Sequence, residues 1–298
     1  MPSVTVALYG GLGNQLFQYA MGRALSLRHG ITLNLDLYGF AIDRRYRRRF
    51  ELEHFDLPSE VGKVRRPAVF RLSWMLSRLA AVRREVASLA RPWLVLEAGP
   101  EFDERSLVLD PGRDSYVLGY WQDERYFSQF GEAIRRDLTL AHTLSKANQE
   151  IASWIRSVNS VAIHARRLHA TRARPGAGAQ PTASQGALSL GVEYYRRAMG
   201  TVTSRVEDPH FMVFSDHPQW ARENLAFGTR TTFFDNDRGP AHEDMVLMSL
   251  CRHHVIANSS FSWWGAWLAR TDDHLVIAPE GVKHTPNKPE SWTSLGAV

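Results

Sequence analysis

Residues 4–20 read VTVALYGGLGNQLFQYA, which combines a strand-like run, a glycine-rich turn and a helical pattern. The first six residues predict a strand, and the apolar residues after the glycines recur at helical spacing. A strand that enters a helix through glycines lets backbone N–H groups approach a phosphate. Gly11 and Gly13 match the dinucleotide-binding spacing only in part, so a purely structural turn remains an alternative. The amides of Asn14 and Gln15, which follow, can donate to ligand oxygens.

The rest of the chain alternates strand-like and helix-like segments. Strands are expected over 32–36, 116–119, 160–165, 210–215, 231–234, 254–257 and 275–278. Helices are expected over 69–89, 124–137, 145–157, 192–202, 217–226, 241–251 and from about 261. Such alternation specifies parallel sheets covered by helices. We therefore expect two α/β domains over residues 1–144 and 145–298, with a loop of small residues over 170–187.

Composition limits the class of protein. The 298 residues, 44% hydrophobic and 22% charged, are typical of a globular chain that buries a core. Cys251 is the single cysteine, which excludes an intramolecular disulfide and favours a reducing compartment. No run of eighteen apolar residues occurs, and the first residues lack the pattern of a secretory signal. These features predict a cytoplasmic protein.

Arginine supplies much of the positive charge and is concentrated in the segment Arg44 to Arg49. This segment could contact nucleic acid, an anionic membrane surface or solvent alone. No nucleic-acid-binding module accompanies the charge, so we expect no nucleic-acid partner. The amphipathic pattern over 69–89 fits either an ordinary core helix or a basic helix on a membrane. A peripheral position at the inner membrane face therefore stays open.

Arg166 and Arg167 follow the strand expected over 160–165, close after His164. Ligands bind open α/β sheets at the carboxyl ends of the strands, and planar guanidinium groups suit phosphate. Neighbouring side chains diverge, so we expect one arginine to face a ligand and the other a structural partner. A metal site at His164 and His169 is not favoured, because no further ligand stands at suitable spacing.

Two further strand ends carry candidate ligand groups. Asp216 follows the strand over 210–215, where its carboxylate could bind a guanine base or cap the next helix. Residues 258–267 read NSSFSWWGAW and follow the strand over 254–257. Serines at this position cap a helix, and the N-terminus of a helix attracts anions. We expect the three tryptophans to lie in the core and the backbone near Ser259 to approach a ligand phosphate.

Together these segments resemble glycosyltransferase family 11, the α-1,2-fucosyltransferases. The resemblance rests on GGLGNQLFQYA at 10–20, HARR at 164–167, FSD at 214–216, DMVLMSLC at 244–251, IANSSFSWWGAWL at 256–268 and VIAP at 276–279. It implies a GT-B architecture of two Rossmann-like domains that face one another across a cleft. It also implies that the C-terminal domain binds GDP-fucose and that the N-terminal domain binds the acceptor.

The resemblance further implies inverting, metal-independent transfer of L-fucose from GDP-β-L-fucose, with no cofactor besides this donor. Arg166 would stabilise the leaving diphosphate, Asn14 would reach the leaving oxygen, and Asp216 would bind the guanine. His164 is the third catalytic candidate. The candidates for the general base are His164, Asp36 and Asp123. The donor-binding candidates are Gly11, Gly13, Asn14, Gln15, Arg166, Asp216, Asn258, Ser259, Ser260 and Phe261.

The expected acceptor is a galactose hydroxyl, O2, on an oligosaccharide or a lipid-linked glycan. One departure from the family pattern is Leu168-His169, where the family usually has Gly-Asp. This change leaves open a transferase for a different GDP-deoxysugar, or a nucleotide-sugar-binding protein without turnover. Asp36 also keeps a nucleotide-dependent oxidoreductase as a formal alternative, although the glycine pattern is incomplete.

Overall fold

The chain forms two compact units, Met1–Thr143 and Leu144–Val298, which are named the N-terminal unit and the C-terminal unit. The computed structural model describes residues 2–80, 93–110, 112–167, 190–227, 230–235, 239–271, 273–282 and 286–297. The expected loop over 170–187 and the departure at 168–169 lie outside these ranges. Among the helices within them, none has the length and apolar character needed to cross a membrane.

The N-terminal unit contains a parallel sheet in the order β3-β2-β1-β5-β4. Its strands are β1 (Ser3–Ala7), β2 (Thr32–Asp36), β3 (Gly62–Val64), β4 (Leu94–Leu96) and β5 (Ser115–Leu118). From β1 the chain first builds the sheet outward through β2 and β3, and it later adds β4 and β5 on the other side. The strand order therefore reverses between β1 and β5. In open α/β sheets, ligands bind at this reversal, beyond the carboxyl ends of the strands.

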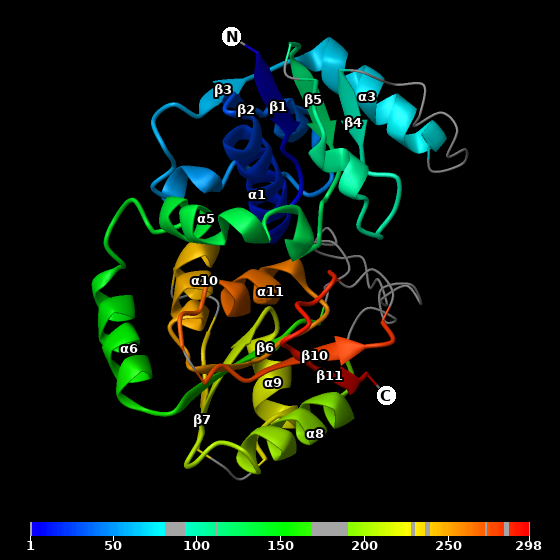
Figure 1. Cartoon of the computed structure of the whole chain (residues 1–298). Helices are drawn as coiled ribbons and strands as arrows, with labels where there is room; N and C mark the ends of the chain where they lie inside the picture. The colour runs from blue at the N-terminus through cyan, green and yellow to red at the C-terminus, as the bar shows by residue number, and fades with distance from the viewer. Residues whose placement is uncertain are drawn as a thin grey trace. The chain divides into compact units, whose positions relative to one another are not determined.

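Helices cover both faces of this sheet (Figure 1). Helix α1 (Leu12–His29) packs on β1 and β2, whereas α3 (Pro67–Ala80) packs on β4 and β5. The described part of this unit also contains a short helix, α2 (Tyr38–Ile42), the later helix α5 (Gly131–Asp137), and 3₁₀ turns at Leu52–His54, Glu104–Leu107, Glu124–Tyr126 and Ser128–Phe130. The single helix expected over 124–137 is wrong, because Phe127 adopts φ −140° and interrupts the helical path.

The C-terminal unit contains a second parallel sheet in the order β11-β10-β9-β6-β7-β8. Its strands are β6 (Ser160–Ala165), β7 (His210–Ser215), β8 (Thr231–Phe233), β9 (His253–Val255), β10 (Val276–Glu280) and β11 (Thr293–Gly296). All six residues of β6 are buried, as expected for a central strand that is covered on both faces. The order of this sheet reverses between β6 and β9.

Two sets of helices enclose the second sheet (Figure 1). The helices within the described residues are α6 (Lys146–Ser157), α8 (Val192–Thr203), α9 (Pro218–Asn224), α10 (Ala241–Ser249) and α11 (Ser260–Trp267). Tyr194 and Tyr195 of α8 pack with Val161 and Ile163 on one face of β6. Side chains of α6 and α10 pack with Ala162 on the other face. The expected fold class, two Rossmann-like α/β domains with parallel sheets, is confirmed.

Candidate functional site

The carboxyl ends of β6 and β9 meet at the strand-order reversal of the C-terminal unit. Arg166 directly follows β6, and the segment from Asn258 to Phe261 follows β9. The His164 and Phe261 rings, one from each strand end, lie 5.5 Å apart. The structure therefore brings to one sheet edge the arginine and the serine-rich turn, two separate motifs in the sequence.

The two adjacent arginines have different surroundings. The Arg167 guanidinium lies 4.3 Å from the centre of the Trp220 ring, and its backbone N–H donates to Asp216 Oδ1 at 2.7 Å. Arg167 thus has structural partners, as expected for one of the pair. Arg166 is half-buried, and its charge helps to lower the pKa of the neighbouring His164. Arg166 directly follows β6 at the carboxyl edge of the sheet, and this position makes it the candidate for a ligand phosphate.

His164 is buried within this site. Burial, and then the nearby charge of Arg166, lower the pKa of its imidazole to about 4. Its Nδ1 atom is buried and has no hydrogen-bond partner among the described residues. The ring is therefore neutral near pH 7 and a weak base, which makes His164 a poor choice for the general base.

We expect the buried His164 to make folding stability depend on pH. The unfolded side chain binds a proton below about 6.5, but the folded one does so only near 4, so stability falls as pH drops from about 6.5 towards 4. Replacing His164 by Gln should weaken this dependence in urea unfolding at pH 7 and pH 5. The exposed His142→Gln serves as the control and should leave the dependence unchanged. An equal dependence in the wild type and in His164→Gln would contradict the assignment.

The turn after β9 forms a capped helix start. Ser259 is the N-cap of α11, and its hydroxyl accepts from the Phe261 N–H at 3.3 Å. The Ser262 hydroxyl donates to the Ser259 carbonyl oxygen at 3.2 Å and so holds the turn in place. The positive end of the α11 dipole is therefore directed at the same sheet edge as Arg166. The tryptophans of α11 are buried core residues, as expected: Trp263, Trp264 and Trp267.

The glycine-rich turn lies at the strand-order reversal of the N-terminal unit. Gly10 has φ +83°, and a Cβ there would also lie 2.9 Å from the side-chain nitrogen of Asn14. Asn14, in the first turn of α1, accepts at Oδ1 from Gln122 at 2.9 Å. Gln122 follows β5, so this hydrogen bond joins the two strand ends that flank the reversal. Gln122 is not among the residues selected from the sequence, although its position shortly after an expected strand is a usable signal.

Three of the polar candidates have structural partners instead. Both hydrogens of the Gln15 amide are donated to backbone oxygens, of Gly10 and Arg49, and its oxygen accepts from the Glu51 N–H. Gln15 therefore ties the arginine-rich segment to the glycine turn and keeps no amide hydrogen for a ligand. Asp36 is buried and accepts from the Tyr116 hydroxyl at 2.7 Å. Asp123 is buried and pairs with Arg125 at 2.6 Å, so both carboxylates are poor general bases.

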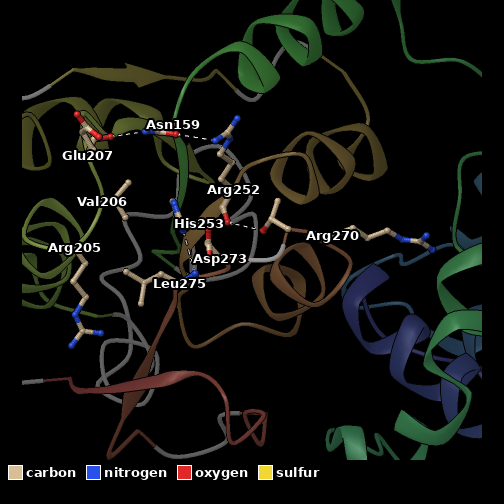
Figure 2. Close-up of a pocket in the computed structure, with 10 residues that line it drawn as sticks. Asn159, Arg205, Val206, Glu207, Arg252, His253, Arg270, Asp273 and Leu275 are labelled. Atoms are coloured by element: carbon tan, nitrogen blue, oxygen red, sulfur yellow. Dashed lines mark hydrogen bonds between the residues drawn. The ribbon is translucent and has the colours of Figure 1, made fainter.

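A pocket of about 700 Å³ in the C-terminal unit lies at the other end of the sheet (Figure 2). Three of its lining residues directly precede strands β6, β9 and β10, namely Asn159, Arg252 and Leu275. The side chains of Arg205 and Arg270 point away from one another, so the arginines of this pocket do not converge on one anion (Figure 2). Because α/β sheets bind ligands at their carboxyl ends, we do not place the donor here.

Comparison with known proteins identifies the family. A family model described as glycosyl transferase family 11 matches residues 103–291. The chain belongs to glycosyl transferase family 11. It is therefore a glycosyltransferase, and the resemblance inferred from the sequence motifs is confirmed. The matched range includes Arg166, Asp216 and the whole serine- and tryptophan-rich segment.

Relatives of this glycosyltransferase cover nearly its whole length. It is 29% identical over 306 residues to the alpha-1,2-colitosyltransferase of Escherichia coli, with 99% of each chain covered. It is 28% identical to the galactoside alpha-(1,2)-fucosyltransferase 1 of Rattus norvegicus, over 90% of this chain and 64% of the relative. A crystal structure of NodZ alpha-1,6-fucosyltransferase, soaked with GDP-fucose, superposes with a TM-score of 0.50 at 13% identity over 90% of this chain and 92% of the NodZ chain. That likeness supports the fold.

Proposed function

We propose that this glycosyltransferase transfers L-fucose from GDP-β-L-fucose to O2 of a galactose residue in a glycan, with inversion at the anomeric carbon. The observation that carries the proposal is the joint position of Arg166 and the N-terminus of α11 at one strand-order reversal. Both features favour a diphosphate. The names of the relatives support fucose or a similar sugar as the transferred group.

The proposed reaction is a single displacement. The acceptor hydroxyl oxygen forms a bond to the anomeric carbon and gives up its proton to solvent water. The bond from that carbon to the diphosphate oxygen breaks, and GDP leaves with the electron pair. Arg166 and the backbone near Ser259 and Ser260 stabilise the charge that develops on the diphosphate. Asp216 provides the carboxylate that binds the guanine N1–H and amino group. Asn14, on the N-terminal unit, reaches the leaving oxygen, and that unit binds the acceptor.

A related GDP-deoxysugar is the alternative donor, because one relative is named a colitosyltransferase. Colitose differs from fucose by the absence of one ring hydroxyl, so a hydrogen bond to that hydroxyl would set the preference. The experiment compares GDP release from GDP-fucose and GDP-colitose with a panel of β-galactosides. Faster acceptor-dependent release from GDP-fucose supports the proposal. Faster release from GDP-colitose would replace the donor, and GDP binding without turnover from either donor would indicate a binding protein.

We expect the transfer to continue in EDTA. Asp235 and Asp237 form an Asp-x-Asp sequence, a pattern that can hold a metal ion on a diphosphate, so metal independence needs its own test. Asp235 is paired with Arg222 at 3.0 Å, and the described residues contain no group of three metal-ligating side chains. Rates measured in about 5 mM EDTA and in added Mg²⁺ should agree within roughly twofold. In this proposal the charge of Arg166 stabilises the diphosphate in place of a metal ion. A loss of activity in EDTA that Mg²⁺ restores would contradict this.

We also propose that the segment from Arg44 to Arg49 binds an anionic membrane surface that carries a lipid-linked acceptor. All five arginines of the segment are exposed, and they lie beside Ile42 and Tyr46, whose side chains are 44% and 54% exposed. Arginines provide the attraction to anionic lipid, and the apolar side chains can enter the interface. The protein is accordingly placed at the cytoplasmic face of the membrane in this proposal.

Binding to vesicles tests this surface. Replacing Arg44, Arg45 and Arg47 by serine should weaken binding to phosphatidylglycerol vesicles about a hundredfold, at roughly 1 kcal/mol for each arginine. Added salt should weaken the wild type in the same way. The control replaces three exposed arginines of the C-terminal unit, which are Arg196, Arg205 and Arg230. Equal losses in both variants would mean that overall charge, and not this segment, drives the binding.

A further inference from the structure

Three side chains of the N-terminal unit gather at the carboxyl edge of its sheet. Tyr9 lies two residues after β1, Tyr120 lies two residues after β5, and Glu97 directly follows β4. These three strands are neighbours in the order β1-β5-β4, so their carboxyl ends meet at one edge. The Tyr9 and Tyr120 ring centres are 5.1 Å apart. The group therefore occupies the edge where ligands of α/β sheets bind.

An aromatic surface forms around Tyr9. The Trp74 ring of α3 lies 5.3 Å from the Tyr9 ring in an edge-on arrangement, and it stacks on Phe70 at 5.8 Å. Trp74 and Tyr120 remain 40% and 41% exposed. Two large rings that are fixed by packing but partly open to solvent are available for contact with a ligand. We call Tyr9, Trp74 and Tyr120 the aromatic platform.

Glu97 is held firmly next to this platform. Its two carboxylate oxygens accept from the backbone N–H groups of Tyr120 and Trp121, each at 2.7 Å. A Cβ at Gly119 would lie 2.5 Å from the Glu97 Cβ, so glycine is needed for this close approach. Trp121 adopts φ +59°, which is rare for a bulky residue. Such strained turns persist where the surroundings fix them, and they cluster at ligand sites.

The fixed carboxylate retains capacity to bind a ligand. Each oxygen accepts one backbone hydrogen bond and can accept another. Glu97 is half-buried, and burial raises the pKa of its carboxyl group while the two backbone hydrogen bonds lower it. A carboxylate beside exposed aromatic rings disfavours an anionic ligand and suits a neutral one that carries hydroxyl donors and an apolar face. A pyranose ring has both of these features.

We infer that the aromatic platform and Glu97 bind the terminal sugar of the acceptor, whose C–H face stacks on the exposed rings and whose hydroxyls donate to the Glu97 carboxylate. This inference rests on the proposed function, since it gives the N-terminal unit the acceptor side of that reaction. It assigns residues that determine which sugar is positioned for transfer. Glu97 also fixes the turn that leads to Gln122, and Gln122 bonds to Asn14.

The experiment measures acceptor kinetics and direct acceptor binding in the full chain. Trp74→Ala and Tyr120→Ala should each raise the KM for a β-galactoside about tenfold at saturating donor, because each removes an aromatic contact. Glu97→Gln should raise it roughly ten- to hundredfold, since a charge-assisted hydrogen bond is lost. Circular dichroism checks folding. Because Glu97 also supports a turn, its replacement could change the structure of the site. The two aromatic variants therefore test the inference independently of Glu97.

Trp93→Ala is the matched control. Trp93 is 37% exposed and directly precedes β4, so it lies at the opposite end of the strand that Glu97 follows. It should leave acceptor KM unchanged. Unchanged KM in both aromatic variants, or an equal rise in the control, would overturn the inference. Loss of vesicle binding in Trp74→Ala with unchanged acceptor KM would also overturn it, because the ring would then belong to a membrane-binding surface.

A second readout separates this inference from the proposed function. Saturation-transfer NMR with methyl β-D-galactopyranoside reports acceptor binding without donor or turnover, and calorimetry with GDP reports the donor site alone. GDP binding that is kept in Trp74→Ala while the galactoside signal is lost supports the inference. A galactoside signal equal to that of the wild type in both aromatic variants contradicts it. Failure of GDP to bind the wild type would contradict the proposed function instead.

Discussion

Replacing Arg166 by alanine is expected to lower kcat about a thousandfold, with a smaller change in the KM for the donor. Arg166 follows β6 at the strand-order reversal, and its neighbour Arg167 is already engaged by Trp220 and Asp216. Negative charge grows on the diphosphate as GDP leaves, so a guanidinium placed there acts mainly in the transition state. The loss corresponds to about 4 kcal/mol of transition-state stabilisation. Initial rates of GDP release at saturating acceptor measure it.

Two companion variants make this prediction specific. Arg196→Ala removes the same charge from the same unit. Because Arg196 is exposed and pairs with Glu193, the rate of this variant should stay within roughly twofold of the wild-type rate. Arg166→Lys keeps the charge and loses the planar fork, so it should recover only part of the rate. If Arg166→Ala retained the wild-type rate while binding GDP normally, the phosphate-stabilising role would be wrong.

The sequence predicts the long elements of this fold well. The strands over 32–36, 160–165 and 210–215 agree with the structure to the residue. Apolar and polar residues alternate over 32–36, and the other two segments are mostly apolar. Three strands were missed, namely β3, β4 and β11, which have three or four residues each. These three segments show no clear period, and their pairing is decided by the strands beside them.

The candidate site was predictable where residues follow a strand that the sequence pattern reveals. It was not predictable where it depends on contacts between residues far apart in the sequence. Arg166 and Ser259 could be selected because each stands at the end of a strand that the pattern reveals. Gln15 follows the same glycine turn as Asn14, yet its amide is engaged by the backbone at Arg49 and Glu51. Glu97 gave no local signal, since it follows a three-residue strand and its partners lie more than twenty residues away.

Gly22→Ala is expected to destabilise the N-terminal unit by about 2 kcal/mol. Gly22 lies on the face of α1 that packs on the sheet, where a Cβ would overlap Cγ2 of Val6 and lie 2.9 Å from Cδ1 of Leu33. Both neighbours are buried on central strands and have little room to move. Overpacking costs up to about 3 kcal/mol, and the better helix propensity of alanine offsets about 1 kcal/mol. The transition should fall by roughly 4–8 °C in calorimetry.

The opposite result is expected for Gly200→Ala. Gly200 lies within α8, and a Cβ there would meet no atom within 4 Å, so only the gain in helix propensity remains and stability should rise by about 0.5–1 kcal/mol. A third variant combines Gly22→Ala with Val6→Ala, which removes the overlapped methyl group. If overlap causes the loss, the double variant is more stable than the sum of the two single changes predicts. Hydrogen exchange of α1 and β1 localises the effect to this packing. Additive losses would mean that Gly22 is required for another reason, such as its backbone conformation.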